Sequence, residues 1–190
     1  ITEKEKQYLT FARERLETIT AEIKGTTTDG LPARVKNLIT KTPGPAEYPG
    51  ATAVVLLHEE TYELKPSGKA FRQVNRLIKI LNDRGKKYAG PEFVYNSETE
   101  KVELDFARTI KPDGTVLTVT DRQARDVTKY PDYPLYNAIR IKTVVLPEVA
   151  EETVVEYQAR WIINRLPDGK LLWHRELQTT EPILQARYVL

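Results

Sequence analysis

The chain has 190 residues, of which 40% are hydrophobic and 29% are charged, and its formal net charge is +2. Such a balanced charge exerts no strong long-range attraction on nucleic acid or on an anionic membrane, so we expect no nucleic-acid partner. The chain has no cysteine, which excludes disulfides, cysteine-ligated metals and a cysteine nucleophile within it. No apolar run approaches the roughly 18 residues of a membrane-spanning helix, so we expect no membrane insertion of this segment.

The segment from Thr2 to Lys24 is predicted to be a helix, because it contains no Gly or Pro and is rich in strong helix formers. Its apolar residues recur at spacings of three or four and form one stripe: Leu9, Ala12, Leu16, Ile19 and Ile23. Gly25 follows as a C-terminal stop. This helix either packs on the domain or trails from an upstream domain, and the alternative is a coiled-coil partner site.

Residues 26–49 read as a connector, because they contain two clusters of Gly, Pro and Thr. Between the clusters, Pro32 to Thr40 predicts a short helix with Val35, Leu38 and Ile39 on one side. We therefore divide the chain into an N-terminal helix and connector, residues 1–47, and a β-sandwich domain, residues 48–190.

From Ala51 onwards the chain shows the pattern of β-strands. In the clearest strand, every second residue from Val102 to Ile110 is expected on one face and the intervening, mostly polar residues on the other. The stretch 53–57 is apolar on both faces, which indicates a more central strand. Further strands are expected within residues 139–145, 153–163, 171–178 and 183–190.

Three turns of one type separate these strands. Each consists of Pro, then Ser or Asp, then Gly: Pro66-Ser67-Gly68, Pro112-Asp113-Gly114 and Pro167-Asp168-Gly169. Pro fixes φ at the first central position, and Gly supplies the positive φ at which the chain enters the next strand. This predicts a type I turn followed by a bulge, a common hairpin closure. The segment Asn82 to Gly85 is a candidate for a fourth, longer turn.

Many strands joined by hairpins, with no helices between them, predict the fold class. We expect a mainly β protein, an antiparallel two-sheet β-sandwich of hairpins with an N-terminal α-helix. The order of the strands stays open at this point, because hairpin turns fix neighbours but not the closure of the sheets.

Residues suited to catalysis are scarce. Ser67 and Ser97 both fall in turn-like segments, where serine is common without any catalytic role. His58 and His174 are the only histidines, and strand alternation lets each join only the residue two positions away. A zinc site needs three or four ligands. We therefore expect no enzyme activity, no catalytic residue, no metal and no cofactor, although abundant carboxylates leave a cryptic hydrolase as a further hypothesis.

The segment from Lys129 to Asn137 contains three Tyr and two Pro. Proline cannot donate to a central ladder, so this stretch is expected to leave the sheet as a loop. Tyr130, Tyr133 and Tyr136 are candidate ligand-binding residues for a peptide or a glycan, because rigid aromatic side chains make good anchors. The rings can equally form a lid over one end of the core, which is the interpretation that the sequence alone favours.

The order of several short motifs resembles a known bacterial domain. Along the chain these motifs are Tyr48-Pro49-Gly50-Ala51, Thr61-Tyr62-Glu63, the Pro66-Ser67-Gly68 turn, Arg76 to Asn82, Ala107 to Val116, Ile141 to Pro147, Val154-Val155-Glu156-Tyr157 and Pro182-Ile183-Leu184. Together they resemble, over about residues 48 to 190, the domain of unknown function that precedes a transglutaminase-like domain in many bacterial envelope proteins. That family often places Gly where this chain has Glu148 and Glu152, which argues against a positive-φ turn at these two positions.

The resemblance implies a role rather than a site. It suggests a non-catalytic accessory or interaction domain, N-terminal to a transglutaminase-like or peptidase-like domain, that positions that domain or its substrate. It also suggests a periplasmic or cell-surface location. The family domain has no assigned catalytic residues, and the neighbouring domain would use Cys, His and Asp. Since this chain has no cysteine, it looks like an N-terminal piece of a longer protein, whose downstream domain is its expected partner. The alternative is an independent carbohydrate- or peptide-binding module.

Overall fold

The structure is a computed structural model that describes residues 25–42, 44–164, 166, 170 and 179–190. Three predictions fall outside these residues: the helix from Thr2 to Lys24, the turn Pro167-Asp168-Gly169 and the strand at 171–178. The other expected elements can be compared directly.

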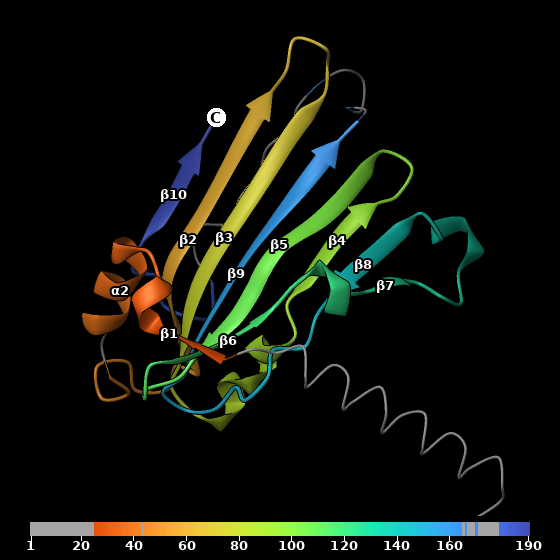
Figure 1. The fold of residues 1–190 in the computed structure, drawn as a ribbon. Coiled ribbons are helices and arrows are strands. Elements are labelled where there is room, and N and C mark those ends of the chain that lie inside the picture. The colour runs from red at the N-terminus through yellow and green to blue at the C-terminus, as the bar shows by residue number, and fades with distance from the viewer. Residues whose placement is uncertain (1–24, 43, 165, 167–169, 171–178) are drawn as a thin grey trace, which may run out of the picture.

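The described residues form two sheets (Figure 1). The large sheet has the order β1-β6-β5-β9-β3-β2-β10. Its strands are β1 (Gly25–Thr27), β2 (Ala53–Leu64), β3 (Ala70–Ile80), β5 (Glu100–Ile110), β6 (Thr115–Val119), β9 (Val154–Ile163) and β10 (Ala186–Val189). The small sheet has the order β4-β8-β7 and contains β4 (Glu92–Asn96), β7 (Arg125–Thr128) and β8 (Ile139–Thr143).

The predicted mainly β fold with two sheets is confirmed, with one correction. All strand pairs are antiparallel except β10, which runs parallel to β2, so the large sheet is mixed. The reason lies in the connection: β9 ends at Ile163 and β10 begins at Ala186. A connection of this length can cross over and return in parallel, whereas a tight hairpin cannot.

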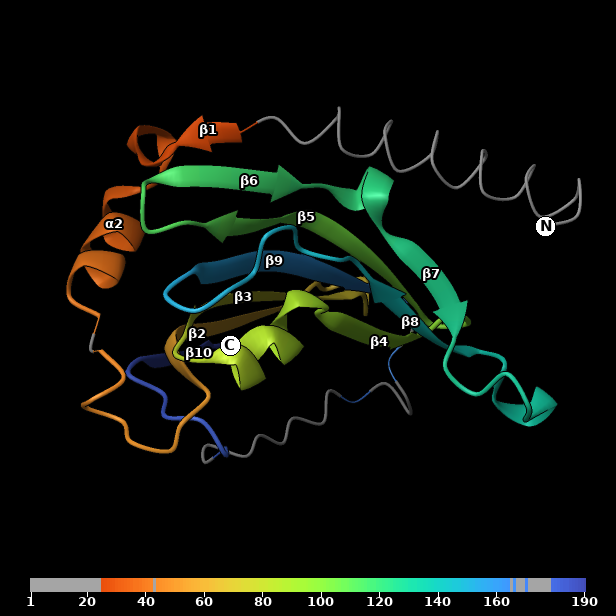
Figure 2. The ribbon, with the colours of Figure 1, turned by 90° about the horizontal axis from the view of Figure 1, so that it is seen from below.

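The main core lies between the two sheets, where aromatic side chains meet. Phe93 of β4 makes edge-on contacts with Tyr157 and Trp161 of β9, with ring centroids 5.5 and 5.9 Å apart. The Trp161 indole Nε1–H donates a hydrogen bond of 3.0 Å to the Val94 carbonyl. Figure 2 shows the small sheet and the 3-10 segment η2 (Asp83–Ala89) on one side of the large sheet. From the small sheet, this packing buries Phe93 and Tyr95 of β4 in the main core.

A second core lies on the opposite face of the large sheet, under helix α2 (Ala33–Thr40). Val35 is buried there with Leu31, and Leu38 and Ile39 pack against the same cluster. The short helix predicted between Pro32 and Thr40 is therefore confirmed, with its apolar side facing the sheet. The strand β1 adds to the edge of β6, so residues 25–40 contribute to the same body as the strands. The proposed division at residue 47 stays a prediction.

Two hairpin turns have the predicted geometry. In the β2–β3 turn, the Gly68 N–H donates to the Lys65 carbonyl (2.9 Å), the Lys65 N–H donates to the Lys69 carbonyl (2.8 Å) and Gly68 has φ of 79°. The β5–β6 turn repeats this pattern around Gly114, whose φ is 86°. Both are type I turns with a glycine bulge, as expected from Pro-x-Gly.

The segment Asn82 to Gly85 is not a hairpin turn, and that prediction is wrong. It begins the 3-10 segment η2, with the Asn82 side chain accepting a hydrogen bond of 3.1 Å from the Arg84 N–H. Gly85 is needed for space, because a Cβ added there would lie 2.4 Å from the Thr52 carbonyl oxygen. The glycine at position 85 is therefore explained by the close approach of the Thr52 backbone rather than by turn geometry.

Strand β5 departs from simple alternation. Its pairing with β9 shifts between Leu104 and Phe106, which marks a β-bulge. Val102 and Leu104 face the main core, but after the bulge Ala107 takes that face and Phe106 does not. The extra residue reverses the phase of every later side chain, so the prediction of one uninterrupted alternation is wrong beyond Leu104.

Glu148 and Glu152 both have positive φ, 51° and 66°, which overturns the expectation drawn from the missing glycines. This conformation costs roughly 1–2 kcal/mol for a residue with a Cβ. Local contacts hold it: the Glu148 carboxylate lies 2.9 Å from Lys111 Nζ, and the Glu152 carboxylate lies 2.7 Å from Lys79 Nζ. The Glu152 N–H also donates to the Ile80 carbonyl at 2.9 Å. The loop geometry is therefore kept without the glycines.

Candidate functional site

The three predicted tyrosines lie together on one loop, residues 129–137, which we call the tyrosine loop. It joins β7 to β8 and projects beyond both sheets (Figures 1 and 2). Among the described residues, Tyr130, Tyr133 and Tyr136 line a shallow pocket of about 390 Å³. The rings of Tyr130 and Tyr136 meet edge to face, with centroids 5.8 Å apart and an interplanar angle of 64°. The structure thus brings together all three residues that the sequence singled out.

The spacing of three residues explains why the rings gather. The Tyr133 N–H donates to the Tyr130 carbonyl (3.1 Å), and the Tyr136 N–H donates to the Tyr133 carbonyl (2.9 Å). Consecutive bonds of this i to i+3 kind place side chains three residues apart on the same side. Pro134 starts the short 3-10 segment η4 (Pro134–Tyr136), where its fixed φ fits and its missing N–H costs nothing.

The lid interpretation of this loop is wrong. The exposed fractions of Tyr130, Tyr133 and Tyr136 are 39%, 62% and 55%, and Leu135 beside them is 94% exposed. Rings that covered the core would be largely buried. The assignment of the three tyrosines as ligand-binding residues stays a prediction, but their exposure leaves them free of a packing role.

A polar cluster fixes the base of the tyrosine loop. The Arg140 guanidinium on β8 donates from Nε to the Asp126 carboxylate on β7 at 2.7 Å, and the Tyr95 hydroxyl on β4 donates to the same carboxylate. Burial, and then the hydrogen bond to Asp126, raise the pKa of Tyr95 above its usual range. One carboxylate therefore joins all three strands of the small sheet, which holds the loop on a fixed support.

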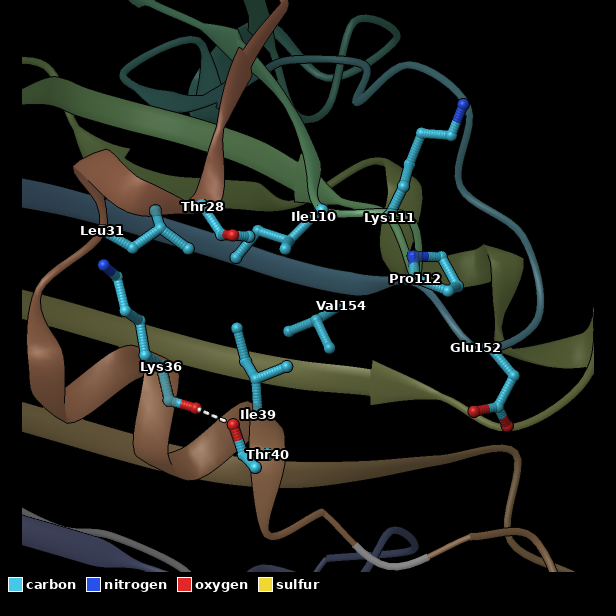
Figure 3. A pocket seen from close by; sticks show the side chains of 11 residues that line it. Thr28, Leu31, Lys36, Ile39, Thr40, Ile110, Lys111, Pro112, Glu152 and Val154 are labelled. Carbon is cyan, nitrogen blue, oxygen red and sulfur yellow. Dashed lines mark hydrogen bonds between the residues drawn. The ribbon is translucent and has the colours of Figure 1, made fainter.

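A second pocket, of about 310 Å³, lies between α2 and one end of the large sheet (Figure 3). Its apolar residues, Leu31, Ile39, Ile110 and Val154, converge on the space. Lys36 at its rim donates to the Asp29 carbonyl at 2.9 Å. The charged residues Lys111 and Glu152 also line it and have partners in Glu148 and Lys79. The pocket thus combines an apolar floor with a polar rim, in which Lys111 and Glu152 are ion-paired and Lys36 is bound to a backbone carbonyl.

A third hollow, of about 330 Å³, lies on the outer face of the large sheet. It is lined by Thr61, Glu63, Lys65, Phe71, Gln73 and Arg160. Glu63 pairs with Lys65, and Arg160 pairs with Asp105 at 2.7 Å. Ion pairs of this kind are what a solvated sheet face ordinarily carries, which is the interpretation we give the described residues of this hollow.

Sequence reasoning missed a buried carboxylate on β2. Glu60 is 1% exposed and accepts hydrogen bonds from the Tyr62 hydroxyl (2.8 Å) and from the Arg72 guanidinium. His58 Nε2 lies 3.5 Å from the same carboxylate. The Arg72 guanidinium also stacks on the Trp161 ring, 4.4 Å from its centroid. The available signal was the i, i+2 spacing of His58, Glu60 and Tyr62, which places all three on one face of the strand.

Two more carboxylates, Glu156 and Glu181, are held inside the fold, and their pKa values are shifted in opposite directions. Burial raises the pKa of Glu156, against the lowering effect of Arg108, whose Nε donates to it at 2.7 Å. Burial also opposes ionisation of Glu181, but hydrogen bonds from Thr52, Lys87 and two backbone N–H groups outweigh it and lower the pKa of Glu181 to about 2. Both groups link distant parts of the chain, which is a structural role.

The two serines considered as nucleophiles lie in structural positions. Ser67 lies in the β2–β3 turn, and the Ser97 hydroxyl donates to the Ala138 carbonyl at 3.2 Å. His174 lies outside the described residues. Over the part of the chain that the structure describes, no group of three or more His, Asp or Glu is placed to hold a metal ion. No helix among these residues has the length and apolarity needed to cross a bilayer.

Comparison with known proteins adds a family and a fold. Residues 66–190 match DUF3857, a domain of unknown function with a solved structure. The chain belongs to this family. The resemblance to a domain of unknown function is thereby confirmed, while the expected transglutaminase-like neighbour of this DUF3857 domain stays a prediction. No curated protein matches the chain.

The fold of the DUF3857 domain recurs in a larger protein. A 2.00 Å crystal structure of a protein from Parabacteroides distasonis ATCC 8503, named as a putative protease, matches 73% of this chain with a TM-score of 0.67 and 17% sequence identity. At that identity the likeness shows the fold alone. The match covers only 28% of the length of that protein, so most of the larger chain has no counterpart here.

A weaker likeness carries no argument. The CBM3a-L domain with flanking linkers from scaffoldin cipA of the cellulosome of Clostridium thermocellum gives a TM-score of 0.33 at 13% identity. It covers 65% of this chain and 72% of that one.

Proposed function

We propose that this DUF3857 domain is a non-catalytic accessory domain of a larger protein. In this role it positions a neighbouring transglutaminase-like or peptidase-like domain, or the substrate of that domain, in the periplasm or at the cell surface. The observation that carries the proposal is the recurrence of the fold as 28% of a larger chain named as a putative protease. A module that recurs inside a longer protein is suited to act on its neighbours.

The internal contacts of the domain support this role. Glu60, Glu156 and Glu181 are engaged by arginine, lysine, hydroxyl or backbone donors, and each tie joins separate strands or loops. These networks stiffen the sheets. A stiff body with a projecting loop is suited to holding a partner or substrate in place, because ordering costs are met before binding.

The test uses the parent protein. We expect its reading frame to encode a Cys-His-Asp domain beside this one, and activity to vanish when that cysteine is replaced by alanine. Ser67→Ala and Ser97→Ala in this domain should leave kcat within about twofold. A parent chain with no such domain, or a tenfold loss of kcat from either serine variant, would contradict the accessory role.

A positioning role also predicts a difference between substrates. Tyr133→Ala in the parent protein should lower kcat/KM for a polypeptide substrate but not for a small chromogenic substrate of the same active site. Leu64→Ala offers a control, because Leu64 is an exposed apolar residue at the end of β2, in the large sheet, whereas the tyrosine loop joins two strands of the small sheet. Equal loss on both substrates would point to an indirect effect on the catalytic domain.

The tyrosine loop favours a second candidate function. An independent carbohydrate- or peptide-binding module would use the pocket between Tyr130, Tyr133 and Tyr136, which no core packing explains. This function requires that the isolated chain bind a ligand without any neighbouring domain. Titration of the purified chain with peptides and oligosaccharides separates it from the accessory role, which places no such demand on the isolated chain.

A further inference from the structure

We propose that the tyrosine loop binds a proline-rich segment in the extended polyproline II conformation. This proposal goes beyond the accessory role, because it names a ligand class and a site on the isolated chain. It rests on the arrangement of Tyr130, Tyr133 and Tyr136 around one pocket. Grooves lined by aromatic rings are a recurring mode for binding such segments.

The first step of the argument is that the site is formed in advance. Two successive i to i+3 hydrogen bonds fix the three tyrosine backbones. A third, from the Asn137 N–H to the Pro134 carbonyl (3.3 Å), closes η4, and the Lys129 N–H donates to the Ile139 carbonyl (2.9 Å) where the loop meets β8. A loop held in this way loses little freedom when a ligand binds.

The second step is the shape of the pocket. The ring planes of Tyr130 and Tyr136 are inclined by 64°, so they form two walls rather than one flat platform. A platform suits the flat face of a long polysaccharide. Inclined walls instead receive a compact ring such as the pyrrolidine of proline, which contacts both aromatic faces or edges at once.

The third step is the polar chemistry of the lining. Among the residues that the structure describes, only the three tyrosines line the pocket, so within that part of the chain its lining carries no carboxylate or amide side chain. Within the described part of the chain, the hydroxyls of Tyr130, Tyr133 and Tyr136 form no hydrogen bond with another residue, and they remain available as donors. A polyproline segment has no backbone N–H at its prolines and presents carbonyl acceptors that are not used internally. Neutral phenol donors and neutral carbonyl acceptors are complementary.

Other ligand classes fit this lining less well. Sugar hydroxyls act as donors and acceptors together, and their recognition favours carboxylate and amide groups, which are not among the described residues that line the pocket. An anionic lipid surface is attracted by clusters of basic residues. The tyrosine loop contains Lys129, which lies over the Tyr130 ring at 5.3 Å, and also Asp132. Its charge is therefore balanced.

The experiment titrates decaproline into the isolated 190-residue chain labelled with ¹⁵N. We expect saturable chemical-shift changes that concentrate on residues 129–139. A decapeptide of alternating Gly and Ser, with the same length but no polyproline preference, should bind at least tenfold more weakly. Cellohexaose, chitohexaose and phosphatidylglycerol vesicles serve as probes of the competing ligand classes.

Two variants of Tyr133 separate the contribution of its ring to binding from that of its hydroxyl. Tyr133→Ala should weaken decaproline binding at least tenfold, and Tyr133→Phe should weaken it by about threefold to tenfold if the hydroxyl donates to the ligand. Leu64→Ala is the control, and it should bind decaproline as tightly as the unsubstituted 190-residue chain does. Thermal unfolding of each variant shows whether it is folded, and Tyr136→Ala provides an independent removal of one wall.

The proposal is overturned if decaproline produces no shifts, or if it binds Tyr133→Ala as well as the original chain. Saturable binding of an oligosaccharide or of vesicles, with none of decaproline, also overturns it and assigns the loop to that ligand class. None of these outcomes depends on the parent protein's activity. Failure of the polyproline proposal is therefore distinguishable from failure of the accessory role, because the accessory role is tested by the activity of the full-length parent protein.

Discussion

The region around Trp161 in the large sheet and the tyrosine loop beyond the small sheet use aromatic residues in opposite ways. Trp161 is 5% exposed, packs on Phe93 and lies under the Arg72 guanidinium. Tyr133 is 62% exposed, and its ring lines a pocket open to solvent. The difference teaches that aromatic content alone does not determine role: the buried rings of the first region pack in the core, whereas we expect the exposed rings of the second to add little to stability.

The largest expected effect comes from truncating the core ring. Trp161→Ala should lower the free energy of unfolding by about 3–5 kcal/mol, because it leaves a cavity between the sheets and orphans the Val94 carbonyl. Urea unfolding followed by circular dichroism measures this. A loss below about 1 kcal/mol would mean that the two sheets do not pack as described.

The next test concerns a buried charge in the same sheet. Arg108→Ala should cost about 3–5 kcal/mol, because Glu156 is 2% exposed and would lose its ionic partner. The double variant Arg108→Met with Glu156→Leu removes both charges and should recover much of the loss. If the single and double variants are equally unstable, side-chain volume rather than the unpaired carboxylate is responsible.

A smaller effect is expected from pH. The pKa of Glu181 is about 2 in the fold against an ordinary value of 4.5, so the unfolded chain binds the proton more tightly. The stabilisation by Glu181 is therefore complete above pH 4.5 and is lost as the pH falls towards 2, by at most about 3 kcal/mol. Glu181→Gln should flatten this part of the profile of unfolding free energy against pH. An identical slope in the variant would exclude Glu181 as its source.

The smallest stability effect is expected at the tyrosine loop. Tyr133→Ala should change the free energy of unfolding by less than about 0.5 kcal/mol, because the ring is mostly exposed and makes no core contact. Thermal unfolding of the variant beside Trp161→Ala gives the direct comparison. A loss above about 2 kcal/mol would show that the loop contributes to the core and would remove the contrast on which its binding role depends.

Much of the fold follows from local patterns. Gly68 and Gly114 follow Pro and Ser or Asp in turns whose geometry is fixed by φ preferences, so the two described hairpins were predictable. The helix between Ala33 and Thr40 was predictable from its apolar side. The bulge at Asp105 was not, because nothing in the alternation of β5 marks it. Its carboxylate is held by Gln158 and Arg160 of the neighbouring strand, each at 2.7 Å.

The candidate site was predictable in part. Tyrosines at positions 130, 133 and 136 next to prolines identified a loop with aromatic anchors. Their exposure was not predictable, because whether a loop folds back over the core depends on the strands that carry it. The cluster of Asp126, Arg140 and Tyr95 joins three strands distant in sequence and supports the loop from below.

By itself the sequence determined the longer central strands, the two described hairpin turns and the composition of the tyrosine loop, because periodicity and φ preferences act over a few residues. Only the tertiary structure decided that β10 lies parallel to β2, that Glu148 and Glu152 adopt positive φ, and that the three tyrosines face solvent. Each of these depends on contacts between segments far apart in the chain, where ion pairs and packing outweigh local preference.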